Sequence, residues 1–309
     1  MGREASFPEE FIKYVNNSNL GIEAEMVKVG ALEADELCQY KVIIDRISHE
    51  IPFYRCFLKT AALSGTVLIN NPFWWAADDK FFGTALLERL GIAVPRSVLL
   101  PQKSYKEDVW NESLRNLKYP LDWHKVVEYT GLPAIMKPYD GGGWKQVYKV
   151  HSVDELIYYY DQTGTTCMML QEFINFDRYV RCYTIGRKNV LVMPYDPTKP
   201  YLQGQYFQDD NYIDKKLHDR IVADCIKLNE ALGYDMNTAE FAIRGGIPYA
   251  IDFTNPAPDA DKQSVGEYNQ RWFIENLAEL AAGYCRKSEK AHREMRWSEF
   301  LNPVLVGAR

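Results

Sequence analysis

Residues 239–255 read AEFAIRGGIPYAIDFTN, two apolar runs joined by a glycine pair, and this stretch predicts a β-hairpin. Side chains alternate between the two faces of a strand, so one face would be apolar and the other would combine acids with small alanines. The apolar face would hold Phe241, Ile243, Tyr249, Ile251 and Phe253, and the other face Glu240, Ala242, Arg244, Ala250 and Asp252. The second face would leave room for a ligand above the sheet.

The connection between the two strands decides whether the two acids share a face. Glu240 and Asp252 lie on the same side only if the connection holds an odd number of residues or one strand contains a bulge. A plain two-residue turn at Gly245 and Gly246 would place them on opposite faces. Because the apolar pattern needs the same parity, we expect the odd connection.

The acids of the hairpin predict a metal site. Glu240 and Asp252, with the amide oxygen of Asn255, form a hard-oxygen set that suits Mg²⁺ or Mn²⁺ rather than zinc. The alternative is an ordinary amphipathic hairpin whose polar face meets water, and the residues alone do not decide between the two. Asp252 is the stronger candidate, because it ends an apolar strand shortly before Asn255 and Pro256, where the chain leaves the sheet.

A second candidate site follows the strand expected at residues 133–137. Lys137 ends this strand, and Gly141, Gly142 and Gly143 come shortly after it. A glycine backbone can fold closely over phosphate oxygens and offer N–H donors, while a lysine on a strand supplies a fixed positive charge. The alternative is a flexible surface loop. The sequence contains no P-loop, dinucleotide fingerprint or kinase catalytic loop, so those nucleotide folds are disfavoured.

The composition indicates a globular protein. The chain has 309 residues with 47% hydrophobic content, enough for two or three subdomains. Its net charge of -6, without a basic block, argues against a nucleic-acid partner. The six cysteines are scattered without zinc-ligand spacing and are expected to be reduced thiols. The absence of a signal peptide and of about 18 consecutive apolar residues predicts a cytoplasmic protein that binds no membrane, although Met1, Gly2 and Ser6 fit a loose myristoylation pattern.

The first third of the chain alternates expected strands and helices, which is typical of a parallel α/β layer. Its strands are expected at residues 41–45, 66–70 and 92–100, and its helices at 51–63 and 80–90. The remainder mixes strands and helices in another order. Strands are expected there at residues 133–137, 147–150, 168–173, 179–185 and 189–193, and helices at 152–160, 215–232 and 267–284.

Five segments together resemble the ATP-grasp superfamily, with the layout of RimK-like carboxylate-amine ligases. They are DDKFFGTALLERLGIAVPRSVLL (78–100), PAIMKPYDGGGWKQV (133–147), MMLQEFI (168–174), RYVRCYTIG (178–186) and NTAEFAIRGGIPYAIDFTNPAPD (237–259). Residues 40–72 are similar to the α/β domain that precedes the ATP-grasp domain in that group. The resemblance implies an α/β fold class, α+β in the ATP-grasp part: a Rossmann-like domain over 1–75, then a two-lobed ATP-grasp domain over 76–309. The small lobe would span about 76–165 and the large lobe about 166–309.

The resemblance also implies residues for ATP. Lys80 and Lys137 look like the two phosphate lysines, and the glycine run 141–143 like the loop that closes over the triphosphate. Asp177 is a candidate for the ribose hydroxyls. The hinge whose backbone reads adenine would consist of Gln171, Glu172, Phe173 and Ile174.

Glu240, Asp252 and Asn255 match the set that holds Mg²⁺ in that family. Asn255 lies one residue later than the family pattern, so Thr254 is an alternative ligand. Tyr179 replaces the acid expected before VRCYTIG, which weakens the assignment of Asp177. Residues 196–211 differ from the acceptor loop of the ligases, so the resemblance says less about the acceptor than about ATP.

The activity implied is an ADP-forming ligase, in which a substrate carboxylate attacks ATP and an amine captures the acylphosphate. Lys137 and Arg181 would offset charge during transfer, although Arg181 could instead be a partner for a nearby carboxylate. A phosphoryl transferase with a non-amine acceptor and a nucleotide-binding protein without turnover stay open as alternatives. The substrates would be small-molecule or peptide carboxylates and amines of unstated identity, and the oligomeric state, a homo-oligomer included, is also left open.

Overall fold

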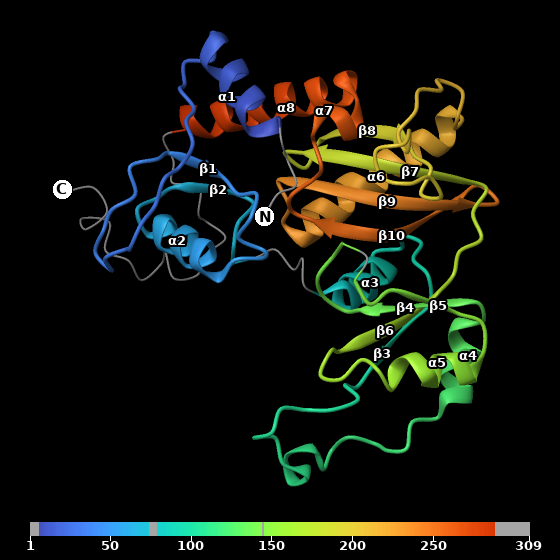
Figure 1. Ribbon diagram of the computed structural model, residues 1–309. Coiled ribbons are helices and arrows are strands. Elements are labelled where there is room, and N and C mark those ends of the chain that lie inside the picture. The colour runs from blue at the N-terminus through green and yellow to red at the C-terminus, as the bar shows by residue number, and fades with distance from the viewer. Residues whose placement is uncertain (1–5, 74–78, 144, 288–309) are drawn as a thin grey trace. The chain divides into compact units, whose positions relative to one another are not determined.

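The computed structural model describes residues 6–73, 79–143 and 145–287, so the myristoylation pattern at Met1 and Gly2 lies outside the described residues. The chain divides into two compact units (Figure 1). The first unit is Met1–Trp75, Tyr179–Glu240 and Phe253–Arg309, and the second is Ala76–Arg178 with Phe241–Asp252. The domain and lobe boundaries predicted from the sequence stay a prediction. No helix within the described ranges is long and apolar enough to cross a membrane.

The first unit opens with α1 (Phe7–Asn17), β1 (Val42–Ile44), α2 (Pro52–Leu63) and β2 (Val67–Ile69). β1 and β2 pair in parallel, as expected for two strands joined by a helix. Ile43, Leu58 and Leu68 are buried between these elements. A parallel pair with one helix is part of the expected α/β layer, and a complete Rossmann-like domain stays a prediction.

The first unit also contains most of a second sheet and its helices. The strands are β7 (Arg178–Ile185), β8 (Asn189–Pro194), β9 (Met236–Arg244) and β10 (Ile247–Asn255), and the helices α6 (Lys215–Leu232), α7 (Lys262–Val265) and α8 (Glu267–Arg286). Among the described residues the strand order is β10-β9-β7-β8, and β7 and β8 form an antiparallel hairpin. The tips of β9 and β10 count with the second unit. α6 matches the helix expected at 215–232. It buries one stripe of Leu217, Ile221, Cys225 and Leu228, and it ends at Gly233 in the left-handed conformation.

The helix α1 was not predicted. Phe7, Phe11 and Val15 are spaced by four residues, so they lie on one face and are buried in a core that includes Phe273 and Leu277 of α8. The rings of Phe7 and Phe273 meet edge to face at 5.3 Å. The helix is therefore held by the last described helix of the same unit.

The second unit is built on another sheet. Its strands are β3 (Ser97–Leu100), β4 (Ala134–Pro138), β5 (Tyr148–Val150) and β6 (Met168–Glu172), and its helices α3 (Lys80–Arg89), η1 (Asn111–Leu114), α4 (Trp123–Thr130) and α5 (Val153–Tyr160). The order within the described residues is β3-β6-β4-β5, with antiparallel pairs throughout. The expectation that residues 92–100 belong to a parallel layer was therefore wrong. A short apolar run does not encode its partner, and β3 finds β6 about 70 residues later in the chain.

The register of this sheet separates a core face from a polar face. Leu100, Met136, Val150 and Leu170 are buried on the core face, together with side chains from α4 and α5. Residues that stand opposite each other share a face. One row across the four strands consists of Ser97, Gln171, Ile135 and Lys149, each opposite the next. Lys137 and Met169, opposite each other, lie on the same face two residues along. The other face therefore gathers Lys137, Lys149 and Gln171, the side chains on which the site is built.

Candidate functional site

Two lysines of the second unit converge on the end of its hairpin segment. Lys80 opens α3, where the Asp79 carboxylate accepts a hydrogen bond from Phe82 N at 2.8 Å and caps the helix. Lys80 Nζ donates to Asp252 Oδ1 at 2.9 Å, and Lys137 Nζ donates to the carbonyl of Ile251 at 3.4 Å. The Lys80 side chain is 13% exposed and that of Asp252 is 41% exposed. The structure thus brings Lys80, Lys137 and Asp252 together, with the carboxylate accessible to solvent.

The glycine run follows β4 at the end that carries Lys137. Gly141 and Gly143 have φ of +77° and +74°, which few other residues adopt without strain. A Cβ added at Gly141, Gly142 or Gly143 would meet nothing within 4 Å. Gly141 and Gly143 are therefore needed for the backbone path, and none of the three glycines is needed for close packing. Lys80 N donates to Tyr139 O at 2.8 Å, which fixes the start of α3 against the chain leading into this loop.

Near the predicted adenine hinge, the structure adds Lys149, which was not predicted, to Gln171, which was. Gln171 is 3% exposed and its Nε2 lies 3.4 Å from Ser97 Oγ, on the same sheet face as Lys137. Lys149 shares that face, and its Nζ lies 3.7 Å from the centre of the Phe173 ring, a cation–π contact. The pairing of β4 with β5 could have indicated Lys149, because it places Lys149 opposite Ile135, two residues before Lys137.

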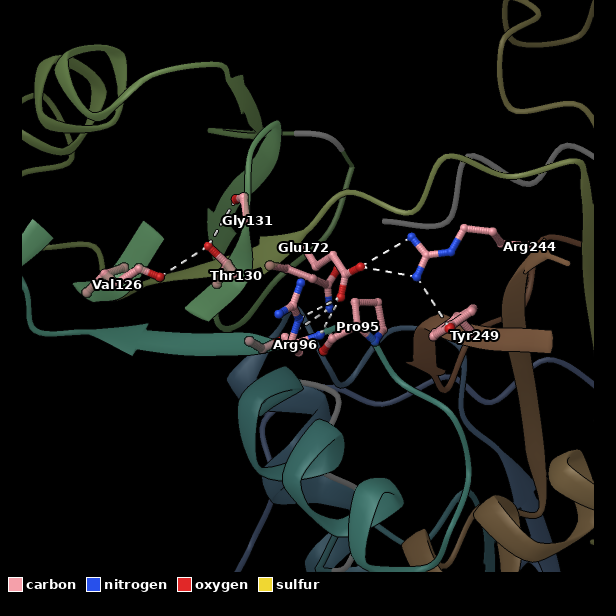
Figure 2. A network of polar contacts seen from close by, with 10 residues as sticks. Pro95, Arg96, Val126, Thr130, Gly131, Glu172, Arg244 and Tyr249 are labelled. Carbon is pink, nitrogen blue, oxygen red and sulfur yellow. Dashed lines mark hydrogen bonds and ion pairs between the residues drawn. The ribbon is translucent and has the colours of Figure 1, made fainter. Parts of the chain in front are cut away.

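Glu172 is held by two arginines (Figure 2). Its Oε1 accepts from both terminal nitrogens of Arg244 at 3.2 Å, and its Oε2 accepts from Arg96 Nε at 3.2 Å and from Arg96 N at 3.4 Å. Arg244 also lies over the Tyr249 ring, with its Cζ 4.9 Å from the ring centre. Glu172 is thus engaged by its side chain, as no local pattern in the sequence could show.

Ile174 of the predicted hinge and Asp177, the candidate for the ribose hydroxyls, lie in two different environments. Ile174 is buried, at 3% exposure. Asp177 donates from its backbone N to Ile243 O at 2.7 Å, and its Oδ2 accepts from Gly245 N at 2.9 Å. The Asp177 carboxylate therefore has one oxygen on the turn of the β9–β10 hairpin. Its predicted contact with ribose stays a prediction.

The connection of the β9–β10 hairpin differs from the expectation. Gly245 and Gly246 separate the strands, and their φ values of +57° and +76° are those of a two-residue type I′ turn. The expectation of an odd connection was wrong, because a Gly-Gly pair satisfies the tightest turn that matches strand twist. Without a bulge, this turn places Glu240 and Asp252 on opposite faces. A shared metal ion stays a prediction that requires a bulge in one strand.

The first unit holds Glu240 in an aromatic environment. Arg181 Nε lies 3.1 Å from Glu240 Oε1, and Arg181 Nη1 donates to the Tyr206 hydroxyl at 2.8 Å. The Tyr179 hydroxyl donates to Glu240 Oε2, and the Tyr195 ring lies 5.0 Å from the guanidinium. Burial opposes the charge on Arg181, but Tyr206 and Glu240 outweigh it and raise the pKa of the guanidinium above its usual range. Tyr179 stands where the family pattern has an acid, and its hydroxyl contacts the carboxylate of Glu240.

The exit from β10 is fixed by Asn237. Its side chain donates to Phe253 O at 2.8 Å and accepts from Asn255 N at 2.9 Å. The Asn255 side chain accepts from Ala257 N at 3.2 Å, whereas Thr254 Oγ1 is buried and has no hydrogen-bond partner among the described residues. Thr254 therefore offers an uncommitted oxygen, and the choice between Thr254 and Asn255 as a metal ligand stays open. No group of three or more His, Cys, Asp or Glu side chains suited to a metal occurs in the described ranges.

Comparison with known proteins identifies the fold. No protein-family model and no curated protein matches the chain. The structure of N5-carboxyaminoimidazole ribonucleotide synthetase from Thermus thermophilus is similar over 77% of this chain and 59% of that one, with a TM-score of 0.54 and 17% identity. The structure of the VanG D-Ala:D-Ser ligase from Enterococcus faecalis is similar over 79% of this chain and 72% of that one, with a TM-score of 0.53 and 16% identity.

The ATP-grasp ligase PsnB, complexed with a minimal precursor, Mg and ADP, is similar over 74% of this chain and 68% of its own, with a TM-score of 0.50 and 17% identity. The chain spans less than two thirds of the T. thermophilus synthetase. These likenesses confirm the ATP-grasp fold that the sequence motifs indicated. At this level of identity they establish the fold alone.

Proposed function

We propose that this chain is an ADP-forming ligase that uses Mg-ATP to join a carboxylate to an amine through an acylphosphate. The observation that carries the proposal is the convergence of Lys80, Lys137 and Asp252 in the second unit. Two ammonium groups beside a solvent-accessible carboxylate are the charges that a triphosphate with its magnesium ion needs. The ATP-grasp fold and the ADP and Mg recorded in the PsnB complex support this assignment.

The lysine pair would take the phosphates. Lys80 Nζ pairs with Asp252 in the absence of ligand. When ATP binds, the ammonium group would move from Asp252 to a phosphate oxygen. A metal cation would then take its place beside Asp252, so that the carboxylate is not left without a positive partner. Asp252 would then hold the magnesium ion, with Glu240 and Asn255 or Thr254 as the further predicted ligands. Their hard oxygens fit magnesium chemically. Magnesium, when bound, would neutralise charge on the phosphate oxygens.

The proposed reaction asks the protein for positioning and charge. A carboxylate oxygen of the substrate bonds to the γ-phosphorus of ATP as the bond to ADP breaks, and the amine then attacks the acyl carbon and releases phosphate. Lys137 is proposed to offset negative charge on the transferred group. Arg181 is proposed to do the same from the first unit, where it now pairs with Glu240. The precursor peptide bound by PsnB supports peptides among the possible substrates.

Nucleotide binding is the first test. Titration calorimetry with Mg-ATP would compare the wild type with Lys80→Met, Lys137→Met and Asp252→Asn. Because each lysine would donate a charge-assisted hydrogen bond, we expect each lysine variant to bind roughly 10- to 100-fold more weakly. Lys103→Met is a matched control, since Lys103 pairs with Asp161 at the surface of the same unit. Absence of binding to the wild type, or equal affinity in all variants, would contradict the proposal.

Product analysis is the second test and separates the chemistries. Incubation with ATP, Mg²⁺ and panels of carboxylates and amines should release ADP and phosphate and form an amide. Hydroxylamine in place of the amine should yield a hydroxamate, because it intercepts an acylphosphate. A phosphorylated product that resists hydroxylamine would indicate a phosphoryl transferase. ATP binding with no ADP release across the panel would indicate a nucleotide-binding protein without turnover.

A further inference from the structure

The tip of the β9–β10 hairpin holds both ends of residues 172–177, which run from the predicted adenine hinge to Asp177, the candidate for the ribose hydroxyls. At one end, both terminal nitrogens of Arg244 donate to Glu172 Oε1 at 3.2 Å. At the other end, Asp177 N donates to Ile243 O at 2.7 Å, and Gly245 N donates to Asp177 Oδ2 at 2.9 Å. All these residues belong to the second unit. Residues 172–177 are therefore fixed at their two ends by three consecutive residues of the hairpin.

The contact at Glu172 uses the whole carboxylate. Arg244 occupies Oε1, and Arg96 occupies Oε2 through its Nε and its backbone N (Figure 2). The Glu172 side chain is 15% exposed, whereas Arg244 is 40% and Arg96 is 51% exposed. The carboxylate thus lies inside and the two cations close over it from outside. The backbone N–H of Glu172 is engaged as well, because it donates to Arg96 O at 2.8 Å.

Arg244 is itself held in place. Its guanidinium stacks on the Tyr249 ring at 4.9 Å, and its Nη2 lies 3.3 Å from the Tyr249 hydroxyl. Tyr249 and Arg244 flank the turn from the two strands, so the tight turn at Gly245 and Gly246 presents the arginine at a fixed position. A two-residue turn with both φ positive has little freedom to change length or twist. The two-residue turn, which places Glu240 and Asp252 on opposite faces in the absence of a bulge, therefore also fixes Arg244 beside Glu172.

We propose that the hairpin tip positions the adenine hinge, with Arg244 and the backbone of Gly245 as positioning elements that set nucleotide affinity and base selectivity. The part that concerns nucleotide rests on the proposed function, whereas the clamp on residues 172–177 belongs to the protein without ligand. Holding both ends of this short segment removes backbone freedom before the base arrives, so less is lost on binding. A backbone fixed in this way accepts one arrangement of donors and acceptors and disfavours the others.

Hydrogen exchange of the nucleotide-free protein tests the clamp directly. In Arg244→Ala we expect the amide of Asp177, which donates to Ile243 O, to exchange at least about 10-fold faster than in the wild type. The amide of Cys182, within β7, should keep its protection, which would show that the change is local. Arg271→Ala is the matched control, because Arg271 pairs with Glu275 on an exposed stretch of α8. Unchanged exchange at Asp177 in Arg244→Ala would overturn the clamp, whether or not the protein binds ATP.

Nucleotide affinity tests the proposed effect of the clamp on the binding of ATP and on base selectivity. We expect Arg244→Ala to raise the Kd for ATP about 10-fold, to leave the Kd for GTP closer to its wild-type value, and so to lower the preference for ATP. Under turnover the variant should raise KM for ATP while kcat changes little. Arg244→Lys keeps a single donor and should recover part of the selectivity.

The outcomes separate the two proposals. A wild type that binds no nucleotide would overturn the proposed function, and the exchange result would still decide the clamp. Binding of ATP by the wild type with an unchanged ATP-to-GTP preference in Arg244→Ala would overturn the positioning role and leave the ligase proposal standing.

Discussion

Two acid–cation pairs, one in each unit, show how the same kind of contact can serve different ends. In the first unit Arg181 faces Glu240 and lies against the rings of Tyr195 and Tyr206, and the Arg181 and Glu240 side chains are 15% and 23% exposed. In the second unit Lys80 faces Asp252, whose side chain is 41% exposed. The planar guanidinium is held by ring faces and a phenol, whereas the ammonium group is a point charge on a flexible stem.

The comparison shows that Glu240 and Asp252, both predicted to bind the metal, differ in how firmly their contacts hold them. A carboxylate paired with an enclosed arginine leaves a costly buried charge behind if the contact breaks. A carboxylate that is itself accessible to water, such as that of Asp252, can exchange partners with less change in free energy. Asp252 is therefore the acid more readily released to a ligand, and Glu240 the one more firmly tied to the fold.

The largest expected effect is on the Arg181 pair. Arg181→Met should lower the free energy of unfolding by about 3 kcal/mol, because it leaves the Glu240 carboxylate without its cation in a largely buried place. Urea denaturation at pH 7 would measure the change. Arg271→Met, at an exposed pair, should change it by less than about 0.5 kcal/mol. Equal values for the two variants would remove the contrast between the pairs.

A second effect concerns alkaline pH. Burial raises the pKa of Tyr206 above its ordinary value, so the phenol stays protonated in the folded chain at pH values where the unfolded chain has lost that proton. Stability should therefore fall as pH rises above about 10. Tyr206→Phe should reduce this fall by up to about 1.4 kcal/mol per pH unit.

Denaturation midpoints at pH 8 and pH 10.5 would give the slope for each variant. Tyr201→Phe serves as the control, because Tyr201 is an exposed tyrosine. A slope in Tyr206→Phe that equals the slope of this control would show that the phenol is not protected by the fold.

The smallest expected effect is on the Lys80 pair. Lys80→Met should change the free energy of unfolding by less than about 1 kcal/mol, since its partner carboxylate remains accessible to water. The same urea experiment measures it. A loss as large as that of Arg181→Met would mean that Lys80 is a structural residue and would weaken its assignment to phosphate.

Elements with a strong local pattern were predicted well. The helices expected at 152–160 and 215–232 match α5 and α6, and the strands expected at 179–185 and 189–193 match β7 and β8, because spacing, capping and turn residues within a few positions define them. The pairing of β3 with β6 was missed because partner choice depends on residues far apart in the chain. The helix α1 was missed although Phe7, Phe11 and Val15 carried its signal.

For the candidate site, the sequence indicated residue types and the structure supplied their partners. The contact of Lys80 with Asp252 spans 172 positions, and that of Glu172 with Arg244 spans 72. No local pattern encodes such distances. Parity could be argued from the sequence, but the length of the Gly245-Gly246 connection could not, because an odd loop and a two-residue turn fit the same glycines.

The composition of the second unit has a consequence for anyone who divides this chain. Because Phe241–Asp252 counts with Ala76–Arg178, a fragment cut at Arg178 would lose Asp252 from Lys80, Arg244 from Glu172 and Gly245 from Asp177. A usable excised fragment needs the hairpin tip grafted back through a short linker. For the same reason, a functional recombinant between relatives would need to take Ala76–Arg178 and Phe241–Asp252 from the same parent.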